Sequence, residues 1–368
     1  MPPRLSNVWA FSRAQRAESP KRRWSKPRLG NVWAFSRAQR AESPKRRWSK
    51  PAVALLVVLC ACSSSSSPTA VPGSTASKST TTTAEPTTTT TTAPKFLWPA
   101  VDETGPGVFV SPNGIVLPVI SAGVAHTPCN NAVAPVGTPI LGTNVVIDPG
   151  HGGKEPGAVG PTGLVEKDVN LDISQDVQRL LEAEGAKVVL TRPSDYYSTI
   201  QNRAEIALAL HPQVFISIHH NAEPDGPSDV PGNETYYQIA SPESKRLAGL
   251  LWEEVSAAFA PHKIAWAADT DHGAKFRPSA SGGDYYGILR RGAGITTVLS
   301  EAAFISNPPE EQLLRDPAFK HAEAVAIANA ITRFLATPDP GSGFVEPYPR
   351  TEPAGGGGGP EGCTDPTL

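Results

Sequence analysis

The sequence predicts an α/β domain in which a single mixed or mostly parallel sheet has helices on both faces. Short apolar runs alternate with segments of helical spacing between residues 143 and 336, and this alternation is typical of strands joined by crossover helices. Several of the apolar runs lead directly into polar segments. Polar residues in that position gather at the carboxyl edge of a sheet, where such domains bind their ligands.

The elements of this domain follow one another in a regular order. Strands are expected at residues 145–147, 187–190, 214–218, 235–239 and 296–299. Helices are expected at residues 166–184, 200–210, 242–260 and 317–336. The first helix is expected to end before Gly185 and the second before Pro212, because glycine and proline commonly terminate helices. We assign residues 141–337 to this domain.

The first 51 residues differ in composition from the rest of the chain. They hold 14 Lys and Arg against two Glu, and residues 7–27 recur without change at residues 31–51. The remaining residues hold 19 Lys and Arg against 33 Asp and Glu. A body this acidic is a poor nucleic-acid binder, because neutralising phosphates requires clustered basic residues. We interpret the repeat as a duplicated leader, with a nucleic-acid-binding arm as the alternative.

An apolar run at residues 51–62 follows this basic segment, and the two together are typical of a secretory signal. The run is shorter than the roughly 20 apolar residues of a membrane-spanning helix. Its end resembles a bacterial lipobox, with Cys62 as the lipidated residue. We therefore expect residues 1–62 to export the protein to the cell envelope and to anchor it by a lipid at the outer face of the cytoplasmic membrane. An ordinary secreted protein that is cleaved nearby is the alternative.

Three further segments flank the domain. Residues 63–95 are rich in Ser, Thr and Pro and predict a disordered linker. Residues 96–140 contain short apolar runs broken by Pro and Gly, which predict a small lead-in that is β-rich or irregular. Residues 338–368 have the Pro- and Gly-rich composition of a linker. Cys129 and Cys363 could form a disulfide in an oxidising compartment, and two unpaired thiols or intermolecular pairing are the alternatives.

Four polar side chains stand at the ends of predicted strands or at a helix start. His151 lies in the glycine-rich turn after the first strand, and Glu166 opens the first helix. His219 follows strand 214–218 directly, and Glu301 follows the last strand. Two imidazoles and one carboxylate are the ligand set of many catalytic zinc sites, which keep a fourth position for water. The second carboxylate can then take a proton from that water.

These residues lie within seven motifs that occur in order between about Val145 and Leu335. The motifs are VVIDPGHGGKEPGAVGPTGLVEKDVNL (145–171), LTRPSDYY (190–197), NRAEIA (202–207), VFISIHHNA (214–222), GNETYYQ (232–238), ILRRG (288–292) and VLSEAAFISNP (298–308). Together they resemble the zinc-dependent N-acetylmuramoyl-L-alanine amidase family, in its third amidase type. The resemblance implies that His151, Glu166 and His219 bind one zinc ion per chain and that Glu301 is the general base.

Other polar residues near these motifs have two interpretations each. Adjacent residues of a strand point to opposite sides, so only one of His219 and His220 is expected to bind the metal. Asn221 is expected to orient a ligand or bind substrate, or to hydrogen-bond within its own loop. Arg290 could pair with a carboxylate of the substrate. Asp148 could accept the second ring proton of a ligand histidine, or it could be a turn residue.

The resemblance implies hydrolysis of the amide between N-acetylmuramic acid and L-alanine in bacterial peptidoglycan, in cell-wall remodelling or daughter-cell separation. The expected partners are peptidoglycan and, through the lipid anchor, a membrane, with the enzyme acting as a monomer. A non-catalytic peptidoglycan-binding lipoprotein is the first alternative. A zinc peptidase that acts on the stem peptide, such as a carboxypeptidase, is the second. The pattern at residues 262–286 is too irregular to assign.

Overall fold

The structure is a computed structural model of the 368-residue chain, and it describes residues 96–223, 227, 232–262, 272–346 and 358–368. The expected leader with Cys62 and the expected linker at residues 63–95 lie outside the described residues. Within the described part, no helix is both long and apolar enough to cross a membrane.

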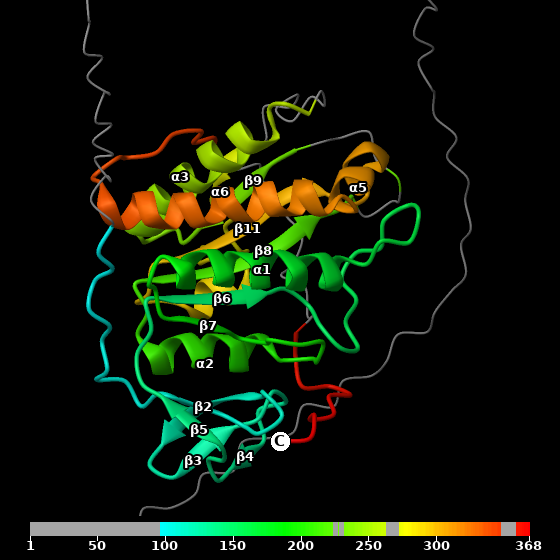
Figure 1. The fold of residues 1–368 in the computed structure, drawn as a ribbon. Coiled ribbons are helices and arrows are strands. Elements are labelled where there is room, and N and C mark those ends of the chain that lie inside the picture. The colour runs from blue at the N-terminus through cyan, green and yellow to red at the C-terminus, as the bar shows by residue number, and fades with distance from the viewer. Residues whose placement is uncertain (1–95, 224–226, 228–231, 263–271, 347–357) are drawn as a thin grey trace, which may run out of the picture. The chain divides into compact units, whose positions relative to one another are not determined.

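A six-stranded mixed sheet forms the centre of the α/β domain (Figure 1). Its strands are β6 (Val145–Pro149), β7 (Val188–Leu190), β8 (Val214–Asn221), β9 (Glu234–Tyr237), β10 (Gly273–Lys275) and β11 (Thr297–Phe304). Their order in the sheet is β10-β9-β11-β8-β6-β7. β11 runs antiparallel to β9, whereas all other neighbours in this order are parallel.

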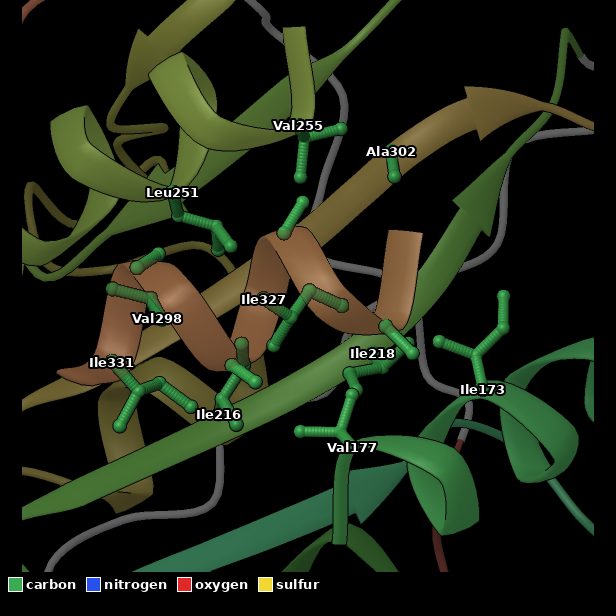
Figure 2. Close-up of a cluster of buried hydrophobic side chains, with 14 of the residues drawn as sticks. Ile173, Val177, Ile216, Ile218, Leu251, Val255, Val298, Ala302, Ile327 and Ile331 are labelled. Carbon is green, nitrogen blue, oxygen red and sulfur yellow. The ribbon is translucent and has the colours of Figure 1, made fainter. Parts of the chain in front are cut away.

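Helices cover both faces of this sheet, which confirms the predicted fold class. The helices are α1 (Glu166–Ala183), α2 (Ile200–Leu210), α3 (Pro242–Phe259), α4 (Gly287–Arg291), α5 (Pro308–Leu314) and α6 (Pro317–Ala336). α1, α3 and α6 share one apolar core with the sheet (Figure 2). α2 and α4 share a second core with the opposite face.

The strands are apolar on both sides because both faces are covered. In β8, Ile216 and Ile218 lie in the core of α1, α3 and α6 (Figure 2), while Phe215 lies in the core of α2. All three side chains are completely buried. Burying one such side chain contributes about 2 kcal/mol to folding, so the sheet is anchored strongly on both sides of the strand that carries His219.

Side-chain caps set where most of the helices begin. Thr199 accepts a hydrogen bond from the Asn202 amide at the start of α2. Asn307 accepts one from the Glu310 amide at the start of α5. Such caps satisfy amides that have no partner inside the helix. α1 has no side-chain cap. Its first residue is Glu166, whose carboxylate is engaged in the candidate site described below.

The lead-in at residues 96–140 forms a second, antiparallel sheet, so it is β-rich. Its strands are β1 (Val108–Val110), β2 (Val116–Ser121), β3 (Val124–His126), β4 (Ala132–Val133) and β5 (Thr138–Ile140), in the order β4-β3-β2-β1-β5. Val108 and Val116 pack in the same core as Ile206 and Leu210 of α2. The small sheet therefore lies against the α2 side of the domain.

Two strands extend further than predicted, and three short elements were missed. β8 continues through His219 to Asn221, and β11 continues through Glu301 to Phe304. Both polar residues therefore belong to strands rather than to the loops that follow, because the ladder between β8 and β11 continues through them. The missed elements are β10, α4 and α5, which have three, five and seven residues.

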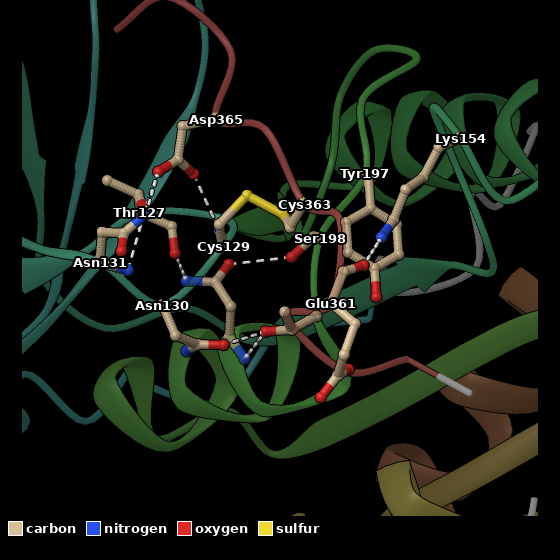
Figure 3. Close-up of a disulfide and its surroundings, with 12 residues drawn as sticks. Thr127, Cys129, Asn130, Asn131, Lys154, Tyr197, Ser198, Glu361, Cys363 and Asp365 are labelled. Carbon is tan, nitrogen blue, oxygen red and sulfur yellow. Dashed lines mark hydrogen bonds between the residues drawn. A yellow bond between two sulfur atoms is a disulfide. The ribbon is translucent and has the colours of Figure 1, made fainter. Parts of the chain in front are cut away.

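The described parts of the tail, residues 338–346 and 358–368, contact the domain. Residues 358–368, which we call the C-terminal strap, are joined to the small sheet by a disulfide between Cys129 and Cys363 (Figure 3). Phe344, earlier in the tail, forms an isolated bridge with Ala274 of β10. A composition rich in Pro and Gly does not report such tertiary contacts.

Candidate metal centre and active site

The turn after β6 brings its histidine back over the sheet. His151 has a φ of 60°, in the left-handed region, and is followed by Gly152 and Gly153 with positive φ. Gly150 lies so close to β8 that an added Cβ would stand 2.2 Å from Nε2 of His219. Only glycine fits there, and this close approach places the two imidazoles side by side with their ring centroids 4.7 Å apart.

His151, Glu166 and His219 form a compact cluster of possible metal ligands. One ligand atom from each lies within 4.8 Å of the others. Nε2 of His151 is 3.1 Å from one carboxylate oxygen of Glu166, and Nδ1 of His219 is 3.0 Å from the other. The three side chains come from a turn, the first residue of a helix and a strand, so the tertiary fold alone brings them together.

The carboxylate of Glu166 is held in place from several sides. It accepts hydrogen bonds from the Ala158 amide at 2.8 Å, from Nδ2 of Asn170 at 3.2 Å and from the His220 amide at 3.2 Å. Burial alone would raise the pKa of Glu166, but the imidazoles of His151 and His219 hold it well below its ordinary value. This carboxylate is therefore ionised, as a metal ligand must be.

Two buried arginines fix the turn that carries His151. Arg192 donates to the carbonyls of residues 149 and 150 at 2.9 and 2.8 Å. Arg203 donates to the carbonyl of residue 149 at 2.7 Å and also to that of residue 151. Burial, with the nearby Arg203 charge, lowers the pKa of Arg192 to about 10, so it stays protonated at neutral pH. Arg203 also forms an internal salt bridge with Asp148.

Glu301 faces the cluster from the neighbouring strand β11. Its Oε2 atom is buried and has no hydrogen-bond partner among the described residues. Burial raises the pKa of Glu301 well above its ordinary value, and the charges of Glu166 and Glu234 raise it further. A buried carboxylate oxygen without a partner is costly, which makes Glu301 a candidate functional group.

A cavity of about 360 Å³ opens beside these residues. It is lined by Asp148, His151, Glu155, Ser198, Ile200, Arg203, Ser217, His219, Tyr285, Tyr286, Gly287, Ile288, Leu299, Glu301 and Gly358. Two tyrosines from the segment before α4 stand on one side. They belong to residues 262–286, for which the sequence pattern predicts no element. Residues 263–271 of this region lie outside the described residues.

The structure also settles which of the two adjacent histidines faces the cluster. His220 points to the opposite face, where Nδ1 lies 2.8 Å from Asn170 and Nε2 lies 3.3 Å from Glu323. The side chains of His220 and Glu323 are completely buried. This agrees with the alternation expected along a strand.

Two further candidates, Asn221 and Asp148, are hydrogen-bonded to residues outside the cluster. Nδ2 of Asn221 donates to Glu234 at 2.7 Å, so it orients neither histidine of the cluster. The carboxylate of Asp148 accepts hydrogen bonds from Thr191, Ser217 and Arg203.

Arg290 is engaged with the backbone at the start of α4. Its Nη1 atom donates to the carbonyls of Asp284 and Tyr285 at 2.6 and 3.0 Å, and it is not among the residues that line the cavity. In this arrangement it supports the tyrosine segment. A direct bond to substrate would require these carbonyl bonds to break.

The donor set of the cluster fits a zinc ion. Two imidazoles and one carboxylate are hard-to-borderline ligands that zinc accepts, and three protein ligands leave an open position as in catalytic zinc sites. The hydrogen bonds to Glu166 orient its carboxylate, as bonds from surrounding groups commonly do for metal ligands. Other divalent transition metals bind the same donors.

An α/β sheet that carries a His-Glu-His cluster with a carboxylate beside it has the side-chain arrangement of domains that can bind a divalent metal ion. The model of the N-acetylmuramoyl-L-alanine amidase family matches residues 145–333, which is just over half of the chain. The chain belongs to this family, and all the cluster residues fall within the matched region. Zinc dependence is typical of the family.

Similar proteins match about half of this chain. The N-acetylmuramoyl-L-alanine amidase LytC of Bacillus subtilis (strain 168) is 35% identical over 191 residues, which cover 51% of this chain and 35% of LytC. The uncharacterised protein YqiI of the same organism is 34% identical over 209 residues, which cover 56% of this chain and 90% of YqiI. The solved amidase AmiC2 of Nostoc punctiforme is 32% identical with a TM-score of 0.46, covering 52% of this chain and 97% of that structure. This chain thus spans about a third of the length of LytC.

Proposed function

We propose that this protein is a zinc-dependent amidase that hydrolyses the bond between N-acetylmuramic acid and L-alanine in peptidoglycan. The observation that carries the proposal is the arrangement of Glu301 beside the His151–Glu166–His219 cluster, within a cavity and within the region matched by the amidase family. The names of the relatives support the same bond as the substrate.

His151, Glu166 and His219 would hold one zinc ion per chain. Bound there, zinc supplies Lewis-acid polarisation of the scissile carbonyl and lowers the pKa of a water toward about 7. The surrounding protein keeps the ligands in place, since Glu166 is fixed by backbone amides and the His151 turn is fixed by buried arginines.

Glu301 is the proton carrier in this proposal. It accepts the proton of the attacking water and then donates it to the nitrogen of L-alanine as the amide bond breaks. The products are a muramic acid carboxylate and a stem peptide with a free amino terminus. The raised pKa of Glu301 suits both steps, because a group of higher pKa takes up a proton more readily and can return it.

Peptidoglycan digestion followed by mass spectrometry tests this proposal. A new amino terminus on L-alanine, lost after treatment with a chelator and restored by zinc, is the expected result. Release of D-alanine would identify a carboxypeptidase instead. Binding of peptidoglycan without any product would identify a non-catalytic wall-binding protein.

We further propose that the protein works outside the cytoplasm, attached by a lipid on Cys62, in cell-wall remodelling or daughter-cell separation. The signal-like sequence supports export, and so does the Cys129–Cys363 disulfide, because disulfides persist mainly in oxidising compartments. Labelling with a radioactive fatty acid is expected for the native chain and not for Cys62→Ala. If deletion of the gene leaves daughter cells attached to one another in rows under the microscope, that result would support the role in cell separation.

A further inference from the structure

The C-terminal strap reaches the candidate active site. Gly358 lines the same cavity as His151 and Glu301, although it is far from both in the sequence. It lies outside the region matched by the amidase family, which ends at residue 333. Part of the cavity lining therefore comes from a segment that the family match does not include.

The near end of the strap is fixed to the residues around the cavity. The amide of Ile200 donates to the carbonyl of Gly358 at 3.0 Å, and the hydroxyl of Tyr197 donates to the carbonyl of Gly359 at 2.5 Å. Nζ of Lys154 donates to the carbonyl of Glu361 (Figure 3). Three carbonyls of the strap are thus held by residues from α2, from the segment before it and from the β6–α1 loop.

The far end of the strap is fixed to the small sheet. The Cys129–Cys363 disulfide joins the two, and Asp365 accepts hydrogen bonds from Thr127, from the Cys129 amide and from Asn131 at 2.7 to 2.8 Å (Figure 3). The last residue, Leu368, packs against the apolar cluster of that sheet. The strap is therefore held at the cavity by hydrogen bonds and at the small sheet by a disulfide, which limits how far it can move from the cavity.

Gly358 is fitted closely to the cavity wall. An added Cβ at this glycine, whose φ is 81°, would stand 2.5 Å from Cδ1 of Ile200. Ile200 opens α2 and packs partly buried against the second core, so it has little freedom to move away. The strap backbone therefore lies directly on a side chain that lines the cavity.

We propose that the C-terminal strap is a specificity-determining wall of the catalytic pocket, which favours short muramoyl peptides over intact peptidoglycan. This inference rests on the proposed amidase function. In the intact polymer the scissile amide is flanked by glycan and peptide that continue in several directions. Any part that continues past Ile200 meets the strap, whereas a short fragment ends within the pocket. A wall tied by a disulfide keeps this restriction permanent under oxidising conditions.

The test compares initial cleavage rates of a soluble muramoyl dipeptide and of insoluble peptidoglycan at equal amide concentration. Cys129→Ser with Cys363→Ser removes the covalent tie, and Gly358→Asn pushes the strap off Ile200 with the disulfide intact. Both variants are expected to raise the polymer-to-fragment rate ratio about tenfold, the range in which a single pocket contact discriminates substrates.

Gly362→Asn is the matched control for Gly358→Asn. Gly362 also has a positive φ, of 60°, but the nearest atom to its added Cβ is Nζ of Lys154 at 3.8 Å, and it does not line the cavity. The polymer-to-fragment rate ratio of Gly362→Asn is expected to equal that of the native chain. Equal ratios in all four proteins would overturn the role of the strap. If the native chain cleaves neither substrate, the amidase proposal itself fails, which is a separate outcome.

Discussion

Glu301 of β11 and His219 of β8 are paired positions on neighbouring parallel strands. Paired residues of adjacent strands point to the same face of a sheet, so this register places an unpartnered carboxylate beside an imidazole of the cluster. A slip of one residue would bring Ser300 or His220 to the cavity instead. Buried apolar residues of the two strands, among them Ile218 and Ala302, hold the register.

Replacement of the proposed proton carrier is the most direct test of this pairing. Glu301→Gln is expected to lower amidase turnover by about 10² to 10⁴-fold, the usual contribution of a general base, while one zinc ion per chain remains bound. Turnover with peptidoglycan and metal content by elemental analysis are the two measurements. Glu182→Gln, which changes an exposed carboxylate of α1, should leave both unchanged. Native-like turnover of the Glu301 variant would remove it from the reaction.

Much of the fold could be predicted from the sequence because most strands and helices show the apolar spacing typical of their type. The helix at residues 200–210 and the helix at residues 317–336 have the predicted bounds, since a cap or proline marks each end. The strand bounds were less accurate. β8 and β11 continue through polar residues, and the length of each strand depends on pairing with its neighbour, which the local sequence does not show.

The cluster residues could be named from motifs, but their supports could not. Arg192 and Arg203 donate to backbone carbonyls of the turn that carries His151. Every residue has such a carbonyl, so the sequence does not show which ones accept these bonds. Gly358 reaches the cavity through contacts between segments far apart in the chain. Such contacts depend on tertiary packing, which composition and local spacing do not encode.

The two adjacent histidines give a matched pair of variants. His219→Ala is expected to lose zinc and activity, and zinc should no longer raise its melting temperature, because a ligand that binds only the folded state stabilises it. His220→Ala is expected to keep the zinc but to lower the free energy of unfolding by about 3 kcal/mol, since it leaves Glu323 buried without its partner. Differential scanning calorimetry with and without zinc measures the melting temperatures that distinguish the two variants. Retained zinc in the first variant and lost zinc in the second would reverse the assignment.

Two glycines of the β6–α1 loop test how closely the cluster is packed. At Gly157 an added Cβ would stand 2.4 Å from Oε2 of Glu166 and 2.6 Å from the His151 ring, whereas at Gly163 it would meet nothing within 4 Å. Gly157→Ala is therefore expected to displace both ligands and to lower zinc affinity at least about tenfold. Zinc titration in a competition assay measures the affinity.

The second glycine controls for backbone strain. Gly157 and Gly163 have φ values of 72° and 89°, so an alanine at either position costs about 1 to 2 kcal/mol of left-handed strain. Gly163→Ala should show this loss of stability with normal zinc affinity. A similar loss of affinity in both variants would mean that loop strain, and not contact with the ligands, governs metal binding.

The buried pair of Asp148 and Arg203 makes stability depend on pH. Burial alone would raise the pKa of Asp148, but Arg203 and two hydroxyl donors hold it below its ordinary value. Asp148→Asn leaves the guanidinium buried without a counter-charge and is expected to lower the free energy of unfolding by about 3 kcal/mol at pH 7. Denaturant titrations of the native and variant chains at pH 7, 5 and 3 measure the difference.

The sign of this dependence follows from the direction of the shift. The folded protein binds the Asp148 proton more weakly than the unfolded chain, whose aspartate pKa is about 3.9, so the stabilisation is complete above that value and is lost as the pH falls through the folded pKa. The gap between native and variant chains should therefore be equal at pH 7 and 5 and smaller at pH 3. Asp172→Asn breaks an exposed pair with Lys320 and should cost no more than about 1 kcal/mol at any of these pH values. A gap that widens at pH 3 would show that Arg203 does not lower the pKa of Asp148.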